Sequence, residues 1–273
     1  MWVSSCGGTR RARLGYDAPM SSEFLSAALE AAEAATGIIQ RLYRGNIEVR
    51  EKADKSPVTI ADVEAEKAIR AVLEARFPDH GFYGEETGTR QRDAEYLWLV
   101  DPIDGTKAYV REYPMFSTQI GLMHRGELIL GVSSASEFGE LAYAEKGQGA
   151  WLDGKRIRVS TIEAFEQATL STGNIKALAL GSRWAAFGAI VSQLDRIRGY
   201  GDFLHYHLLA AGKIEAVIET DVNILDIAAL VAIVEAAGGR FTDLEGRRVS
   251  LETTSVLATN GRLHEPILRA LGH

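Results

Sequence analysis

The sequence has little of three features that mark common classes of protein. It contains one cysteine, Cys6, which excludes an internal disulfide framework and fits a reducing cytoplasm. No apolar stretch comes near the length of a membrane-spanning helix, about 18 uninterrupted residues. Its basic residues are not clustered and its net charge is −7, which argues against a nucleic-acid-binding surface. These absences predict a soluble, cytoplasmic protein that binds neither membranes nor nucleic acid.

The composition is typical of a folded chain with an unusual beginning. Apolar residues make up 46% of 273 residues, enough for one large or two modest domains. Residues 1–20 lack the apolar core of a signal peptide, and we expect them to form a disordered leader. Met20 precedes a helix cap at residues 21–23 and is a candidate natural start. A transit peptide is the alternative.

Apolar periodicity divides the rest of the chain into two halves. The first, residues 21–160, is predicted to be α+β and the second, residues 161–273, to be α/β. Hairpin turns in the first half predict an antiparallel sheet. Helices are expected over residues 24–43, 61–75, 183–193, 203–211 and 227–237. Strands are expected over residues 96–100, 117–124, 127–133, 141–145, 149–152, 169–172, 196–198, 216–219 and 255–259. No linker separates the halves, so they should pack as one body.

The most informative motif is DPIDGT at residues 101–106, directly after the apolar strand 96–100. Pro102 has no amide hydrogen and is expected to end that strand. Gly105 allows the backbone to approach a ligand closely. The amides of Gly105 and Thr106 would open the next helix, whose dipole favours an anion such as phosphate.

Acidic residues around this motif point to a metal. Asp101 and Asp104 would repel a phosphate unless divalent cations lay between them. Glu85 follows a short aromatic strand, and Asp226 begins a strongly apolar helix. Taken alone, each has an ordinary interpretation: a surface turn, a solvated loop acid or a helix N-cap. Occurring together, they favour a metal-assisted phosphate site.

Three motifs, in their order and spacing, resemble the inositol monophosphatase superfamily of metal-dependent, lithium-sensitive phosphatases. They are GEE at 84–86, LVDPIDGT at 99–106 and LDIAALVAIVEAAGG at 225–239. The resemblance runs from Phe24 to the C-terminus. It implies a layered αβαβα sandwich, with an antiparallel sheet in the N-terminal half and a smaller mixed sheet in the C-terminal half. One departure is Leu225, where the family usually has Trp, so the packing behind the following aspartate changes.

The resemblance also implies a set of ligands for two or three Mg²⁺ ions. Glu85 and Asp101 would bind the first ion together with the backbone carbonyl of Ile103. The second ion would be held by Asp101, Asp104 and Asp226, so that Asp101 bridges the two. Glu86 is expected to be a more distant or surface acid, although the sequence leaves a swap with Glu85 open.

The chemistry implied by the family is attack by a water that a metal activates. Thr106, hydrogen-bonded to Asp62 from the second helix, would assist, while the amides of Gly105 and Thr106 would hold the phosphate. Without the resemblance, Asp62 would be interpreted as a first-turn acid that complements the helix dipole. For Lys107 both an acidic partner and simple solvation remain open.

The substrate pocket is expected on the C-terminal half. GTK at 105–107 and RGYGD at 198–202, with the segments 229–231 and 236–239, resemble the histidinol-phosphatase branch more than the inositol branch. Glu219 matches the family position that contacts the leaving group, and Gly201 and Asp202 precede a helix that would approach the same pocket. Histidinol phosphate carries an ammonium and an imidazole, which acids such as Glu219 and Asp202 could bind. His205 and His207 could line the pocket, although packed or solvated histidines are commoner.

The sequence therefore predicts a Mg²⁺-dependent phosphomonoesterase that acts on a small metabolite, with histidinol phosphate as the first choice of substrate. Inositol 1-monophosphate and 3′-phosphoadenosine phosphate are the alternatives. A metal- or metabolite-binding protein on the same fold is the non-enzymatic alternative. The resemblance implies a homodimer.

Overall fold

Two β-sheets alternate with three layers of helices in the computed structural model, which describes residues 22–45, 49–51 and 57–272. The expected leader, residues 1–20, lies outside these ranges. The helices are α1 (Glu23–Leu42), α2 (Ile60–Arg76), α3 (Thr106–Val110), α4 (Lys176–Leu180), α5 (Trp184–Val191), α6 (Asp202–Ala210), α7 (Ile224–Ala236) and α8 (His264–Ala270), with a 3₁₀ turn at Phe165–Gln167.

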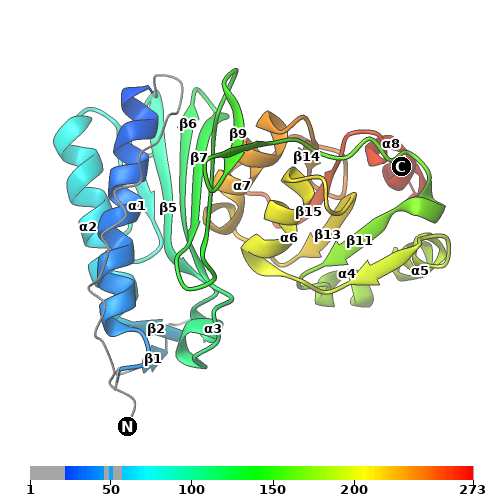
Figure 1. Cartoon of the computed structure of the whole chain (residues 1–273), viewed down its shortest axis with the longest axis horizontal. Helices are drawn as coiled ribbons and strands as arrows, with labels where there is room; N and C mark the ends of the chain where they lie inside the picture. The colour runs from blue at the N-terminus through cyan, green and yellow to red at the C-terminus, as the bar shows by residue number, and fades with distance from the viewer. Residues whose placement is uncertain (1–21, 46–48, 52–56, 273) are drawn as a thin grey trace, which may run out of the picture.

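The layers run from one end of the molecule to the other (Figure 1). Helices α1 and α2 cover the outer face of the larger sheet, and α6 and α7 lie between the two sheets. Helices α4, α5 and α8 lie on the far side of the smaller sheet. This order confirms the predicted αβαβα class. Within the described residues, no helix is long and apolar enough to cross a membrane.

The larger sheet has eight strands in the order β10-β9-β8-β7-β6-β5-β3-β4. Its strands are β3 (Gly81–Gly84), β4 (Thr89–Arg90), β5 (Tyr96–Asp104), β6 (Ser117–His124), β7 (Glu127–Ala135), β8 (Glu140–Glu145), β9 (Gly149–Leu152) and β10 (Lys155–Ile157). Hairpins give the expected antiparallel pairing through most of it. The pair β3 and β5 is parallel instead, because β4 turns back along the outer edge of β3.

The expectation that Pro102 ends its strand is wrong. Strand β5 continues to Asp104, and its register against β6 shifts between Asp101 and Asp104. Across this bulge Asp101 pairs with Gln119 and Asp104 pairs with Ser117. Pro102 lies in the irregular stretch where no ladder amide is needed, and its carbonyl accepts a hydrogen bond from Thr118 Oγ1 at 2.8 Å.

The smaller sheet is mixed, as predicted, with five strands in the order β12-β11-β13-β15-β14. They are β11 (Thr169–Thr172), β12 (Arg196–Arg198), β13 (Ala216–Thr220), β14 (Arg240–Thr242) and β15 (Ser255–Thr259). Strand β11 is parallel to both of its neighbours, and β15 is antiparallel to both of its neighbours. Strand β14 was not expected from the sequence.

The first two helices begin at capping residues. Ser22 Oγ accepts the Leu25 amide at 3.1 Å and starts α1. Two short strands, β1 (Val49–Glu51) and β2 (Pro57–Thr59), pair before α2. Neither strand was expected from the sequence. Thr59 caps α2, and Asp62 completes a capping box by accepting the Thr59 amide at 2.8 Å.

Helix α7 is apolar on all sides because it is buried between the sheets. Its backbone at Ala229 lies so close to Gly131 of β7 that a side chain at position 131 would collide with it. Asn223 is the N-cap of the helix. Asp226 is the third helical residue and completes a capping box by accepting the Asn223 amide, so it is not the N-cap itself. This packing brings the first turn of α7 toward the end of β5.

Candidate active site

Three aspartates from β5 and α7 form one cluster. Asp101, Asp104 and Asp226 each offer a carboxylate oxygen, and these oxygens lie within 4.8 Å of one another. The bulge in β5 turns both Asp101 and Asp104 toward this point, and the close packing of α7 on the sheet supplies Asp226. An all-oxygen set of negative ligands suits a hard cation such as Mg²⁺.

The electrostatics of the cluster show that it needs positive charge. Burial raises the pKa of Asp101 well above its ordinary value, and the charges of Glu85 and Asp104 raise it further. Burial and the charge of Asp226 do the same for Asp104. Burial raises the pKa of Asp226 to about 7, against the lowering effect of its hydrogen bond from the Asn223 amide. Bound cations would remove this mutual repulsion, so the residues fit the expected metal site.

Glu85 lies beside the three aspartates and interacts with Asp101, whose pKa its charge raises after burial. Its side chain is exposed at the end of β3, and its amide donates to the Val100 carbonyl at 3.2 Å, next to Asp101. The loop that carries it is held by Glu66 of α2, whose carboxylate is fully buried. The oxygens of Glu66 accept the amides of Glu86 at 2.7 Å and Thr87 at 2.6 Å.

Thr106 and Asp62 meet, as the sequence predicted. Thr106 Oγ1 lies 3.3 Å from Asp62 Oδ1 and 3.0 Å from the carbonyl of Ile103. The other oxygen of Asp62 accepts both the amide and the hydroxyl of Thr59, at 2.8 and 2.6 Å. Burial raises the pKa of Asp62, and the hydrogen bonds from Thr59 partly oppose that shift. The single hydroxyl proton of Thr106 can serve only one of its two acceptors.

The start of α3 follows the predicted turn. Gly105 is its N-cap with a φ of 90°, a left-handed conformation that favours glycine. A side chain at Gly105 would also press on the carbonyl of Met115, so protein packing as well as ligand approach requires glycine here. The Lys107 side chain is exposed, and no ion pair to it is found within the described part of the chain, which favours the solvated alternative.

The two acids expected in the substrate pocket lie near the cluster. The charges of Asp202 and Glu219 contribute to the raised pKa of Asp104, after burial and Asp226. Burial and the charge of Glu219 raise the pKa of Asp202 to about 6. Asp202 begins α6 with a φ of 45°, an uncommon conformation for a non-glycine residue, and Gly201 is the N-cap before it.

Glu219 is held by residues that the sequence did not single out. Its Oε2 accepts the Tyr206 hydroxyl at 2.8 Å and its Oε1 accepts the Asn174 amide at 3.1 Å. Burial disfavours its charge, yet the interactions with His205 and Tyr206 outweigh burial, and its pKa lies below the ordinary value. Both histidines of α6 are buried, as the commoner interpretation had it. His205 lies against Glu219, whereas His207 bonds to Glu140 and Ser133 of the larger sheet.

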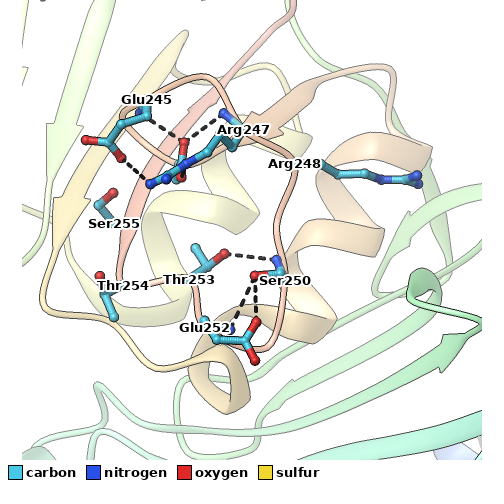
Figure 2. A pocket seen from close by; sticks show the side chains of 9 residues that line it. Glu245, Arg247, Arg248, Ser250, Glu252, Thr253, Thr254 and Ser255 are labelled. Carbon is cyan, nitrogen blue, oxygen red and sulfur yellow. Dashed lines mark hydrogen bonds and ion pairs between the residues drawn. The ribbon is translucent and has the colours of Figure 1, made fainter. Parts of the chain in front are cut away.

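A pocket of about 240 Å³ lies elsewhere and shares no residue with the cluster. Its lining comes from one segment of the chain, Asp243, Glu245, Arg247, Arg248, Ser250, Glu252, Thr253, Thr254 and Ser255. Figure 2 shows Arg247 bonded to Glu245 and Glu252 bonded to Ser250, while Arg248 points away from them. Asp243 accepts the Arg247 amide at 2.8 Å and its Nε at 2.6 Å, so this pocket belongs to the turn after β14.

The αβαβα layers with an aspartate cluster between their two sheets define a class, the layered α/β phosphatases. Within that class, residues 20–273 match the family model described as the inositol monophosphatase family, and the chain belongs to this family. It is therefore an enzyme of the phosphoric monoester hydrolase type.

Relatives carry more than one name. A histidinol-phosphatase of Mycobacterium tuberculosis is 36% identical over 259 residues, which cover 92% of this chain and 99% of that protein. A fructose-1,6-bisphosphatase/inositol-1-monophosphatase of Thermotoga maritima is 31% identical, covering 86% and 91%. Among solved structures, the extragenic suppressor protein suhB of Bartonella henselae superposes with a TM-score of 0.83 at 29% identity, covering 92% and 99%.

Proposed function

We propose that this phosphatase hydrolyses histidinol phosphate with the aid of Mg²⁺. The observation that carries the proposal is the surplus of acid around the aspartate cluster. Glu219 and Asp202 lie close enough for their charges to raise the pKa of Asp104, after burial and Asp226, yet they are not among the three clustered aspartates. A leaving alcohol with an ammonium and an imidazole would be attracted by this surplus. Relatives named histidinol-phosphatase support the same choice.

The ligands proposed for two or three Mg²⁺ ions are those that the family resemblance implies: Glu85, Asp101, Ile103, Asp104 and Asp226. When bound, the ions would supply positive charge that stabilises the phosphoryl oxygens and lowers the pKa of water. The mutual repulsion within the cluster supports this role. Without cations, several negative charges lie together in a buried place, where burial and their neighbours raise the pKa values of Asp101 and Asp104.

The chain's own groups would orient the water and the phosphate. When the Thr106 proton points to Asp62, the Thr106 oxygen is free to accept a hydrogen bond from the attacking water. As Thr106 takes a proton from that water, its own proton would pass to Asp62. Burial raises the pKa of Asp62, which makes its carboxylate a stronger base than an exposed one. The amides of Gly105 and Thr106 would bind the phosphate at the start of α3.

Inositol 1-monophosphate or 3′-phosphoadenosine phosphate is the second candidate substrate. Relatives with inositol-monophosphatase names are nearly as similar to this chain as those with histidinol-phosphatase names. Glu219 could also accept hydrogen bonds from the hydroxyls of a polyol.

The test is phosphate release from the three esters under identical Mg²⁺. We expect kcat/KM for histidinol phosphate to exceed that for the other two by at least tenfold. A preference for either competitor would overturn the substrate assignment and leave the phosphatase assignment intact. The homodimer expected from the family is part of this proposal, and light scattering at micromolar concentration tests it separately.

A further inference from the structure

Helix α6 carries three consecutive polar side chains that are buried almost completely. The exposed fractions of His205, Tyr206 and His207 are 0%, 1% and 1%. Polar groups are seldom buried unless they have partners, so each is expected to do something specific. Two of the three, His205 and Tyr206, converge on the carboxylate of Glu219 from the neighbouring strand β13.

Tyr206 and the chain at Asn174 fix the two oxygens of Glu219. The Tyr206 hydroxyl donates to Oε2 at 2.8 Å, and the Asn174 amide donates to Oε1 at 3.1 Å. Gly173 leaves room for this: a side chain there would collide with Oε1 of Glu219. The carboxylate is therefore held from both sides while 11% of the Glu219 side chain stays exposed.

The position of His205 depends on a chain of hydrogen bonds that starts in the loop before α6. The Tyr200 amide donates to Ser171 Oγ at 3.2 Å, so the Ser171 proton is free to point to His205 Nδ1 at 3.4 Å. Nδ1 is then the acceptor, so the single N–H proton of the neutral ring lies on Nε2, which faces Glu219 Oε2 at 3.3 Å. Nε2 misses hydrogen-bond geometry there and has no other such partner in the described residues.

The order Ser171, His205, Glu219 invites comparison with the triad of acyl-transfer hydrolases. Ser171 is 0% exposed and already accepts a backbone amide, so its hydroxyl cannot reach a substrate. The chain of groups ends at Glu219 instead, the member of the three that is partly exposed. This series of contacts therefore fits the positioning of the Glu219 carboxylate rather than the activation of Ser171.

We infer that His205 and Tyr206 are positioning residues for Glu219: Tyr206 holds the carboxylate by a hydrogen bond, and His205 packs its Nε2 against the same oxygen at 3.3 Å. Together they would set the preference for a leaving alcohol that carries a cationic amine. This inference rests on the proposed function. A carboxylate aimed by fixed donors loses little freedom on binding, so it discriminates an ammonium from a hydroxyl more sharply than a mobile one. Asp202, at the start of the same helix, adds charge but has no comparable clamp among the described contacts.

The chain provides matched controls for both residues. His207 lies on the same helix with the same burial, but its nitrogens bond to Glu140 and Ser133 at 2.9 Å each, away from Glu219. The hydroxyl of Tyr43 is buried and has no hydrogen-bond partner in the described residues. His207→Gln and Tyr43→Phe should therefore report the general cost of changing a buried histidine or tyrosine.

The experiment compares histidinol phosphate with glycerol 2-phosphate, whose alcohol is neutral, at saturating Mg²⁺. For Tyr206→Phe and His205→Asn we expect KM for histidinol phosphate to rise at least fivefold more than KM for glycerol 2-phosphate. His205→Gln, whose amide can donate from the place of Nε2, should recover part of the loss. His207→Gln and Tyr43→Phe should keep the wild-type ratio, and thermal melting shows which variants fold.

Each outcome decides a separate claim. If the wild type prefers histidinol phosphate and Tyr206→Phe and His205→Asn keep that preference while folded, the inference is overturned and the proposed function stands. Equal losses on both esters would also overturn it, because they indicate a structural role. A wild type without any preference for histidinol phosphate would overturn the proposed substrate and the inference together.

Discussion

At the residue scale, the hydroxyl of Thr106 has two possible hydrogen-bond acceptors. It lies 3.0 Å from the Ile103 carbonyl and 3.3 Å from Asp62 Oδ1, and it has one proton to donate. A cation that engages the Ile103 carbonyl would leave Asp62 as the remaining acceptor. The proposed role of Thr106 therefore depends on its oxygen and not on its methyl group.

Removing that oxygen should affect turnover far more than binding. We expect Thr106→Ala to lower kcat by about 10²- to 10⁴-fold, the usual contribution of a positioned proton-transfer group, with a smaller change in KM. Thr106→Ser, which keeps the hydroxyl, is the matched control and should stay within about tenfold of wild type. Steady-state kinetics at saturating Mg²⁺ decides it, and normal kcat in Thr106→Ala would contradict the role.

Several acids of the site, Asp62, Asp101, Asp104 and Asp226, could be proposed from the sequence because each lies at a strand-to-helix turn or in the first turn of a helix. Glu219 lies within β13 and was placed only by the family resemblance. The residues that contact Glu219 could not be found in this way. Whether His205 or His207 faces β13 depends on the rotation of α6 in its packing, and one residue along a helix turns the side chain by about 100°. The donors at Tyr206 and Asn174 are likewise set by tertiary contacts.

At the scale of elements, α2 holds the loop that carries Glu85. Glu66 Oε2 and Oε1 each accept one backbone N–H of the loop. In Glu66→Gln, one of these N–H groups would face the side-chain NH₂ group, which is also a donor, and would lose its hydrogen bond. We expect Glu66→Gln to lower the free energy of unfolding by about 1 to 3 kcal/mol and to weaken Mg²⁺ activation. Urea denaturation and a Mg²⁺ titration measure the two effects.

The control for Glu66 lies on the same helix. Glu64 is exposed and pairs with Lys67 at 3.0 Å, so Glu64→Gln should change stability by less than about 1 kcal/mol. Equal stability of Glu66→Gln and wild type, with unchanged Mg²⁺ activation, would show that the buried carboxylate does not organise the loop.

Helix α8 makes stability depend on pH through His264. Thr242 Oγ1 donates to the Asp243 carbonyl at 2.8 Å, so it accepts from His264 Nε2 at 3.0 Å, while Nδ1 lies 3.1 Å from Thr259 Oγ1. Burial lowers the pKa of His264 from 6.5 to about 4. The stability that this provides is present above pH 6.5 and is lost as pH falls toward 4.

We expect wild type to lose roughly 1 kcal/mol between pH 7 and pH 5 through this histidine, after allowance for solvent screening in the outer layer. His264→Gln should be less stable at pH 7 but should lose less on acidification. Urea midpoints at the two pH values test this, with the partly exposed His124→Gln as the comparison. The same acid loss in His264→Gln and wild type would contradict it.

Strand β5 shows why element boundaries were harder to predict than elements. Pro102 lacks the amide that a ladder needs, so local chemistry ends the strand there. The neighbouring strand β6 supplies a bulge and a hydroxyl from Thr118, and the strand continues to Asp104. The sequence of residues 96–106 contains no sign of the partner that makes this tolerable.

At the scale of the whole molecule, acids from both sheets and from the helices between them gather around the aspartate cluster. Burial raises the pKa of Asp226 to about 7 and of Asp202 to about 6, above their ordinary value of 3.8. Raised pKa values mean stability that is present at low pH and is lost as pH rises through about 6 to 7. The metal-free protein should therefore be less stable at pH 8 than at pH 6.

Mg²⁺ should reverse that loss. Because cations compete with protons for the same oxygens, we expect the rise in melting temperature on adding Mg²⁺ to chelator-treated protein to be larger at pH 8 than at pH 6. Differential scanning fluorimetry at both pH values measures it. No change in melting temperature on adding Mg²⁺ at pH 8 would argue against metal binding in the cluster.

In the proposed scheme, Asp101 would bridge two Mg²⁺ ions, so hydrolysis should depend on both Mg²⁺ and this carboxylate. The most direct test is a Mg²⁺ titration of phosphate release from histidinol phosphate, using chelator-treated wild type and Asp101→Asn. We predict no release by wild type without Mg²⁺ and saturable release with it. Asp101→Asn should be folded and nearly inactive at every concentration. Release without any divalent cation, or near-normal release by Asp101→Asn at saturating Mg²⁺, would contradict the account.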